Sequence, residues 1–171
     1  SGKNILITAG PTYESIDSVR FIGNRSSGKM GVALALECAN NGASVKLILG
    51  PSSIEINHSN ITVFRIESAD EMFELVNSHF KEADVSIFSA AVSDYKASVI
   101  EKGKIKKSNQ EINLSLVNNI DILSEISLKK SSKQFLVGFA LETDNELENA
   151  KNKLKNKNLD MIILNSLNDK G

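Results

Sequence analysis

The sequence predicts an α/β fold, namely a Rossmann-like three-layer sandwich with a mainly parallel sheet. The first reason is that several short runs are apolar throughout, which is typical of strands buried on both faces. The second is that these runs alternate with segments of helical apolar periodicity. Of the 171 residues, 41% are hydrophobic and 24% charged, an ordinary globular balance. We therefore expect a single domain over residues 1–171.

The first half of the chain contains three predicted strands and two predicted helices. A β-branched run over residues 4–9 ends at Gly10, and a polar stretch follows up to Gly28. A helix over residues 29–40 carries its apolar side chains on one face. Ser68 and Glu71 form a capping box that begins the second helix. The other predicted strands in this half are residues 44–49 and 61–66.

The second half contains three more strands and one helix. The strands are predicted at residues 85–91, 134–140 and 159–164. A helix capped at Thr143 runs to about Lys157, and residues 96–110 form a long polar insert of a kind that is often functional. Parallel sheets bind ligands beyond the carboxyl ends of their strands. The loops after Ala9, Ala90 and Ala140 are therefore where we expect a site.

Composition excludes several classes of protein. Lys and Arg total 20 against 21 Asp and Glu, which argues against a nucleic-acid-binding or membrane-binding surface. The sequence has no apolar run long enough to span a membrane and no secretion signal. The single cysteine, Cys38, excludes a disulfide framework and a multi-cysteine metal site. We expect a cytoplasmic protein with neither a nucleic-acid nor a membrane partner.

Residues 23–30, GNRSSGKM, form the densest polar segment. They nearly match a P-loop, but Met30 stands where a magnesium-binding hydroxyl is required and no strand leads directly into the segment. Gly28 and Gly31 favour a dinucleotide loop, again at the wrong distance from the preceding strand. The remaining interpretation is an anion site at a helix N-terminus, with a helix merely capped by Ser27 as the alternative. Its members would be Arg25, Ser26, Ser27, Gly28 and Lys29.

Three other segments are candidates for chemistry. Lysines cluster over residues 102–107 and again over residues 151–157, and each cluster is also compatible with a solvated surface. Residues 90–95, AAVSDY, end a predicted buried strand with small side chains followed by Asp94. Small residues there let a flat ligand approach the backbone, and a carboxylate can bind a ribose hydroxyl or a metal. An Asp in a loop is also a common turn former.

Taken together, these segments resemble one family, phosphopantothenoylcysteine synthetase, over residues 5–170. The motifs that carry the resemblance are ILITAGPT, ID-VRFI-NRSSGKMG (residues 16–31), AAVSDY, KIKK, VGFALET and KNLDMIILN, in matching order and spacing. The resemblance implies a CTP-dependent ligase of coenzyme A biosynthesis that joins 4′-phosphopantothenate to L-cysteine. In that reaction the carboxylate attacks the α-phosphorus of CTP, pyrophosphate leaves, and the amine of cysteine displaces CMP from the acyl-cytidylate. Mg²⁺ would be bound through the nucleotide phosphates.

The resemblance also implies roles for particular residues. Lys104, the first lysine of KIKK, matches the lysine at the nucleotide phosphates, and Asn24 matches the asparagine that handles the acyl-cytidylate. The segment of residues 25–29 is the candidate for the phosphopantothenate phosphate. The nucleotide-binding residues implied in addition to Lys104 are Ala90, Asp94, Ile120, Asp121, Ile122, Leu123, Phe139, Lys153 and Lys157.

The chain also departs from the family. Ile120 replaces the proline of the family's NPDI segment. The family continues past residues 169–171 with a further C-terminal segment, and it often carries a phosphopantothenoylcysteine decarboxylase upstream. The chain is therefore expected to be a shortened stand-alone synthetase or the synthetase part of a bifunctional protein, and to form a homodimer. The alternatives are an NAD(P)-dependent Rossmann oxidoreductase and a nucleotide-binding module without turnover.

Overall fold

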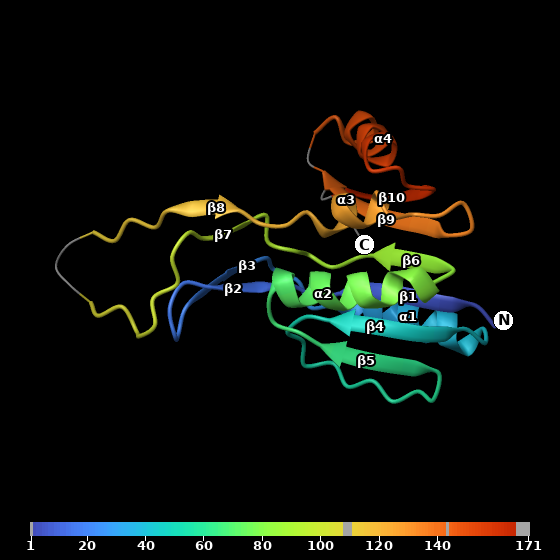
Figure 1. Cartoon of the computed structure of the whole chain (residues 1–171), viewed down its shortest axis with the longest axis horizontal. Coiled ribbons are helices and arrows are strands. Elements are labelled where there is room, and N and C mark those ends of the chain that lie inside the picture. The colour runs from blue at the N-terminus through green and yellow to red at the C-terminus, as the bar shows by residue number, and fades with distance from the viewer. Residues whose placement is uncertain (1, 108–110, 143, 167–171) are drawn as a thin grey trace.

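The computed structural model describes residues 2–107, 111–142 and 144–166. Its centre is a six-stranded sheet in which all the paired strands run parallel (Figure 1). The order across the sheet is β10-β9-β6-β1-β4-β5. The bounds are β1 (Asn4–Ala9), β4 (Ser44–Leu49), β5 (Ile61–Arg65), β6 (Val85–Phe88), β9 (Phe135–Glu142) and β10 (Met161–Ser166). The predicted fold class is confirmed.

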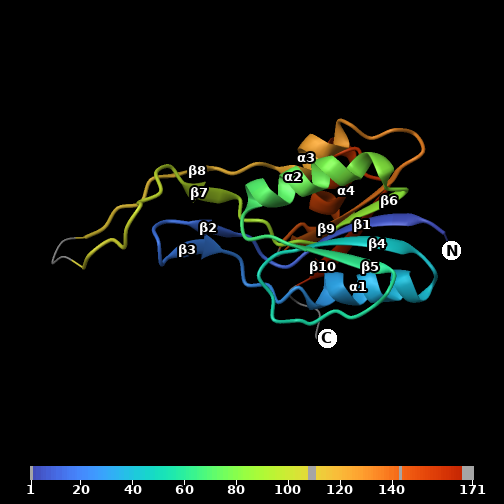
Figure 2. The ribbon, with the colours of Figure 1, turned by 60° about the horizontal axis from the view of Figure 1, so that its bottom comes forward.

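Helices cover both faces of the sheet, as Figure 2 shows. Their bounds are α1 (Lys29–Asn40), α2 (Ala69–His79), the 3₁₀ turn η1 (Phe80–Glu82), α3 (Ile122–Ser127) and α4 (Glu146–Asn156). One face is covered by α1, and the other by α2, α3 and α4. The strand order reverses direction between β1 and β6, because the chain builds outward from β1 to β5 and then returns to β6. A reversal of this kind opens a crevice at the carboxyl ends of the two central strands.

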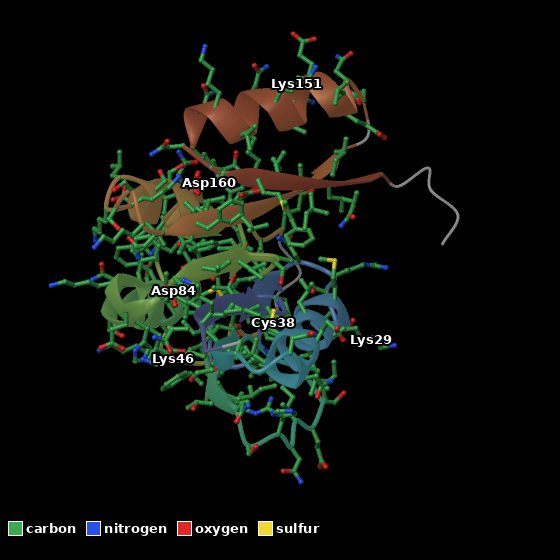
Figure 3. All side chains as sticks on the ribbon, turned by 90° about the vertical axis from the view of Figure 1, so that its right-hand side faces the viewer. Lys29, Cys38, Lys46, Asp84, Lys151 and Asp160 are labelled. Atoms are coloured by element: carbon green, nitrogen blue, oxygen red, sulfur yellow. The ribbon has the colours of Figure 1, made fainter. Side chains whose placement is uncertain are left out.

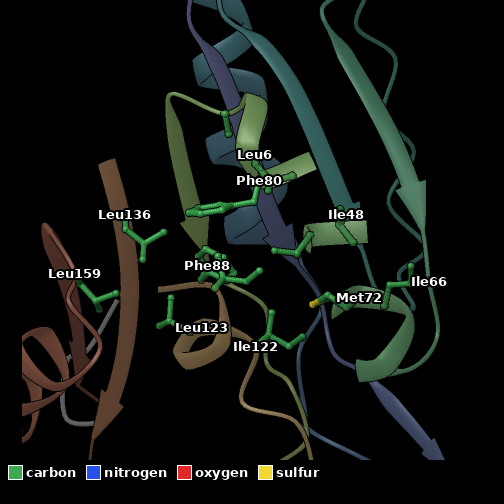
Figure 4. Close-up of a cluster of buried hydrophobic side chains, with 13 residues drawn as sticks. Leu6, Ile48, Ile66, Met72, Phe80, Phe88, Ile122, Leu123, Leu136 and Leu159 are labelled. Atoms are coloured by element: carbon green, nitrogen blue, oxygen red, sulfur yellow. The ribbon is translucent and has the colours of Figure 1, made fainter. Parts of the chain in front are cut away.

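The two faces of the sheet have separate apolar cores. Side chains on alternate positions of a strand point to opposite faces, so Leu6 of β1 faces one core and Ile7 faces the other. Figure 4 shows the first core, which includes Met72 of α2, Ile122 of α3 and Leu136 of β9. In the second core, the alanine-rich face of α1 packs on β1 and β4. Small side chains on α1 allow the helix to lie close to the sheet.

An arm of two short hairpins extends from the carboxyl edge of the sheet (Figure 1). One pairs β2 (Tyr13–Ser15) with β3 (Phe21–Gly23), and the other pairs β7 (Tyr95–Ala97) with β8 (Leu116–Asn118), both antiparallel. The sequence predicted no strands in the polar stretch or in the polar insert, and the structure shows short strands there. The arm also carries large apolar side chains that are mostly exposed, among them Val99 at 69% and Ile100 at 59%.

Two helix starts differ from the sequence expectations. The N-cap of α1 is Gly28, in the left-handed region at φ 77°, rather than Ser27. Gly28 supplies no side-chain cap, but the Oγ of Ser27 accepts the N–H of Lys29, the first residue of the helix, at 3.4 Å. The N-cap of α4 is Asn145, whose side chain makes no cap hydrogen bond, and the predicted cap Thr143 lies outside the described residues. Among the described residues, no helix is long and apolar enough to cross a membrane.

Candidate functional site

The crevice between β1 and β6 opens into a cavity of about 690 Å³ at the carboxyl edge of the sheet. Strands contribute Thr8 from β1, Phe88 from β6 and Phe139 from β9 to its walls. Helices contribute Met72 from α2, while Arg25 and Ser26 lie just before α1. The cavity lies where the predicted fold requires a ligand to bind.

Most of the predicted site residues line this one cavity. Those that do are Asn24, Arg25, Ser26, Ala90, Asp94, Ile120, Asp121, Ile122, Leu123, Phe139, Lys153 and Lys157. They come from five segments that are far apart in the sequence. Ser27, Gly28 and Lys29 do not line the cavity, and neither does Lys104. The roles of all these residues stay predictions.

The start of α1 is held at the cavity by close packing of backbone against backbone. A Cβ added at Gly28 would lie 3.3 Å from the Cα of Gly10, and one at Gly31 would lie 2.4 Å from the Cβ of Ala9. Only glycine permits this approach of α1 to the end of β1. In the described part of the chain, the main-chain N–H groups of Ser26 and Ser27 have no hydrogen-bond partner. Such N–H groups ahead of a helix suit an anion.

Asn24 binds the loop that follows β6. Its side-chain Nδ2 donates to the carbonyl oxygen of Val92 at 2.9 Å and, less closely, to that of Ala91 at 3.4 Å. Its carbonyl Oδ1 makes no hydrogen bond among the described residues. Asn24 therefore connects the segment before α1 to the loop that carries Asp94.

Asn119 is a cavity residue that sequence reasoning missed. Its side-chain amide donates to the Ser93 carbonyl at 3.0 Å, and its own N–H donates to the Asp94 carbonyl at 2.8 Å. Its Oδ1 in turn accepts from the N–H of Ile120 at 3.0 Å. Asn119 thus holds two predicted nucleotide-binding segments together. The signal was its position directly before Ile120, at the start of the NIDI segment.

Asp121 and Lys157 form an ion pair at the far wall of the cavity. The Lys157 Nζ lies 2.7 Å from Asp121 Oδ2, while Asp121 Oδ1 accepts the N–H of Ser124 and caps α3. Burial raises the pKa of Asp121, but the ammonium of Lys157 and the two donors of Ser124 lower it more, so the pKa lies below its ordinary value. Asp121 is therefore ionised near neutral pH, and it orients Lys157.

Among the described residues, three cationic side chains line the cavity. Lys153 points inward and donates from Nζ to the carbonyl oxygen of Phe139 at 2.7 Å, and Lys157 and Arg25 are the other two. They outnumber the two carboxylates, Asp94 and Asp121. A cavity with this excess of positive charge suits a phosphorylated ligand.

The residues that line the main cavity suit a magnesium ion only if phosphate groups of a ligand supply most of its ligands. Among the described residues, no group of three or more His, Cys, Asp or Glu side chains could hold a metal ion. The carboxylate of Asp94 has neither an ion pair nor a hydrogen bond in the described part of the chain. Mg²⁺ is commonly held by one or two carboxylates plus the phosphates of a substrate. Asp94 is the residue that fits such a role.

Lys104 lies in the arm, outside the main cavity. It borders a second hollow of about 640 Å³, which is lined by Ile16 and by residues from the segments 97–105 and 112–115. Its side chain is exposed, as are those of Lys106 and Lys107. Within one chain, the structure does not bring the KIKK lysines together with Lys153 and Lys157.

The whole chain, residues 1–171, matches the model of a family described as the DNA/pantothenate metabolism flavoprotein C-terminal domain. The chain belongs to this family. A crystal structure of the C-terminal domain of the coenzyme A biosynthesis bifunctional protein CoaBC superposes with a TM-score of 0.84 at 43% identity. That match covers 95% of this chain and 76% of the other.

Two curated relatives are about twice as long as this chain. The CoaBC protein of Haemophilus influenzae is 45% identical over 97% of this chain and 41% of its own length. A protein of an unknown prokaryotic organism, named cysteine/cysteine sulfinic acid decarboxylase, is 48% identical over 100% of this chain and 48% of its own length. The chain thus spans about half the length of these relatives.

Proposed function

We propose that this chain is a phosphopantothenoylcysteine synthetase domain, which joins 4′-phosphopantothenate to L-cysteine with CTP. The observation that carries the proposal is that one cavity gathers the segments expected to bind the nucleotide and the phosphopantothenate phosphate. Membership of the pantothenate-metabolism family and the likeness to CoaBC support it. The proposal accounts for the excess of cations around the cavity.

The proposed reaction has two steps. A carboxylate oxygen of phosphopantothenate attacks the α-phosphorus of CTP, and the bond to pyrophosphate breaks. The amine nitrogen of cysteine then attacks the acyl carbon of the acyl-cytidylate, loses a proton, and CMP leaves. Lys153, Lys157 and Lys104 would neutralise the charge that develops on the phosphates. When bound, Mg²⁺ would polarise the phosphoryl oxygens.

Asn24 and Asp94 fit distinct tasks in this scheme. The amide of Asn24 lies beside the start of α1, and an amide can donate to a developing oxyanion without titrating. The carboxylate of Asp94 faces the cavity beside the small residue Ala90, where a ribose hydroxyl or a phosphate-bound metal would be accommodated. Arg25 and the N–H groups of Ser26 and Ser27 would bind the phosphate of phosphopantothenate.

We further propose a homodimer, and fusion or association with a phosphopantothenoylcysteine decarboxylase. The exposed apolar side chains of the arm support the dimer, because a second copy would cover them. A second copy packed on the arm would also enclose the KIKK segment. The length of the CoaBC relatives, which are described as bifunctional, supports the fusion.

Ligand binding separates this proposal from an NAD(P)-dependent oxidoreductase. In differential scanning fluorimetry of the full chain with Mg²⁺, CTP is expected to raise the melting temperature, because a ligand that binds only the folded state stabilises it. NADPH at the same concentration should have no effect. Stabilisation by NADPH with none by CTP would contradict the ligase proposal.

A further inference from the structure

A buried carboxylate lies within the arm, in residues that do not line the main cavity. Asp17, in the turn between β2 and β3, is only 3% exposed. Its Oδ1 accepts the main-chain N–H groups of Val19 at 2.8 Å and Arg20 at 2.7 Å. Its Oδ2 accepts the guanidinium of Arg20 and the N–H of Ile105 at 3.0 Å. A buried carboxylate is tolerated only where donors satisfy it, and both oxygens of Asp17 are satisfied.

Arg20 adds hydrogen bonds to the main-chain carbonyl of Ile105, whose N–H is bound by Asp17. Both terminal nitrogens of its guanidinium donate to the carbonyl oxygen of Ile105, each at 3.3 Å. The Asp17–Arg20 pair therefore binds the N–H and the C=O of a single residue. A further link, from the N–H of Glu101 to the carbonyl of Ile16 at 3.0 Å, holds the same two segments together. We call this arrangement the Asp17 clamp, meaning Asp17, Arg20 and the main chain of Ile105.

The residue held by the clamp is next to the predicted phosphate-binding lysine. Side chains alternate along an extended segment, so a fixed main chain at Ile105 determines the side on which Lys104 and Lys106 lie. Ile105 is partly buried, while both lysines are exposed. Hydrogen bonds to a charged partner are about twice as strong as neutral ones. A charged pair is therefore well suited to hold a segment that has no strand partner of its own.

We propose that Asp17 is a positioning residue for the ligase reaction. It acts through the main chain of Ile105 to place the ammonium of Lys104, and it makes no contact with substrate itself. This inference rests on the proposed function, because it requires Lys104 to act on the nucleotide phosphates. The competing interpretation is that the clamp only stabilises the arm, in which case its loss would lower stability without affecting the step that uses Lys104.

A double-mutant cycle separates these two interpretations. We would measure kcat and KM for CTP in the full chain, its Asp17→Asn and Lys104→Gln variants, and the double variant. The side-chain oxygen of asparagine can still accept the N–H groups of Val19 and Arg20, but its NH2 group cannot accept from the Arg20 guanidinium or from the N–H of Ile105. Each single variant is expected to lower kcat about 10²-fold, because a small misplacement of a reacting group costs about that much.

The decisive result is the rate of the double variant. If Asp17 acts only through Lys104, the double variant should match Lys104→Gln to within about twofold. Independent effects would instead multiply, to about 10⁴-fold below the unmodified chain, and would overturn the proposal. A wild-type rate for Asp17→Asn beside a defective Lys104→Gln would also overturn it, leaving the proposed function intact. A fully active Lys104→Gln would contradict the proposed role of the lysine itself.

A control variant removes a carboxylate with a similar set of donors at a more exposed position, since the side chain of Asp160 is 29% exposed and that of Asp17 is 0% exposed. Asp160 accepts the N–H of Leu136 at 2.7 Å and pairs with Lys130, much as Asp17 binds Ile105 and Arg20. It lies at the edge where the strands begin, which faces the viewer in Figure 3. Asp160→Asn should lower stability and leave kcat within about twofold. An equal fall in kcat for both variants would mean that stability alone explains the effect.

A second variant and a spectroscopic readout keep the test informative if Asp17→Asn folds poorly. Arg20→Lys keeps the charge but not the two nitrogens that bind the Ile105 carbonyl. We expect a smaller fall in kcat, about tenfold, together with faster hydrogen exchange at the Ile105 amide by NMR. Unchanged hydrogen exchange at Ile105 and unchanged kcat in Arg20→Lys would show that the Asp17 clamp does not position Lys104.

Discussion

At the scale of single residues, Asn24 makes a hydrogen bond that shapes the cavity and also has a proposed role in the reaction. Its amide donates to the carbonyl of Val92 and thereby holds the loop that ends in Asp94. An aspartate cannot donate, and its charge would repel the same carbonyl. Asn24 thus has both a structural contact and a proposed contact with the reaction intermediate.

Asn24→Asp is expected to uncouple the two half-reactions. The added negative charge disfavours the developing oxyanion of the second step, so acyl-cytidylate should accumulate and be detected by mass spectrometry of quenched reactions. Asn41→Asp is the matched control, because Asn41 also donates to a main-chain carbonyl, that of Glu37 at 2.8 Å, far from the cavity. Normal turnover by Asn24→Asp without detectable intermediate would contradict the assigned role.

Asp17 gives a prediction about pH at the same scale. Burial raises its pKa, but the N–H groups of Ile105, Val19 and Arg20 and the guanidinium of Arg20 outweigh burial and lower the pKa to about 2. A lowered pKa in the folded state contributes stability above the ordinary value of 3.8, and this contribution is lost as the pH falls towards 2. Between pH 5 and 3, the free energy of unfolding, measured with urea, should fall more in the unmodified chain than in Asp17→Asn. Equal falls would show that Asp17 is not responsible.

At the scale of elements, the predictions succeeded where burial enforces a pattern. Residues 29–40 and 44–49 were predicted exactly as α1 and β4, because each carries an apolar face or run that only a buried helix or strand explains. The hairpins of the arm were missed. Their strands have three residues each, and β3 and β8 are mostly exposed, so the sequence is too short to show an alternation of polar and apolar side chains. Tertiary contacts such as the Asp17 clamp hold them instead.

The start of α1 is the element that most constrains the cavity. A Cβ at Gly31 would lie 2.4 Å from the Cβ of Ala9 and 2.6 Å from the hydroxyl of Ser89. Gly31→Ala should therefore destabilise the fold by about 1–3 kcal/mol, since overpacking forces the backbone to shift. Urea unfolding measures this, with Gly103→Ala as the control, because nothing lies within 4 Å of an added Cβ there. Equal stability of the two variants would contradict the close packing of α1 on β1.

At the scale of the whole molecule, the sequence predicted which segments contribute to the site, but not how all of them are arranged in space. Motif order pointed to the segments around Asn24, Asp94, Asp121 and Lys153, and the reversal of strand order brings them to one cavity. The sequence did not reveal that Lys104 lies apart from them, because the long insert folds into an arm whose direction depends on contacts with residues 16–20. Asn119 was missed because its hydrogen bonds are to main-chain groups of Ser93, Asp94 and Ile120, and a sequence pattern does not show such contacts.

The central claim is that the chain activates phosphopantothenate with CTP. The most direct test is pyrophosphate release by the full chain from CTP and Mg²⁺, with and without 4′-phosphopantothenate and in the absence of cysteine. We predict release only when 4′-phosphopantothenate is present, with formation of acyl-cytidylate, and conversion to the amide and CMP once cysteine is added. Pyrophosphate release that is independent of 4′-phosphopantothenate, or no release from CTP at all, would contradict the account.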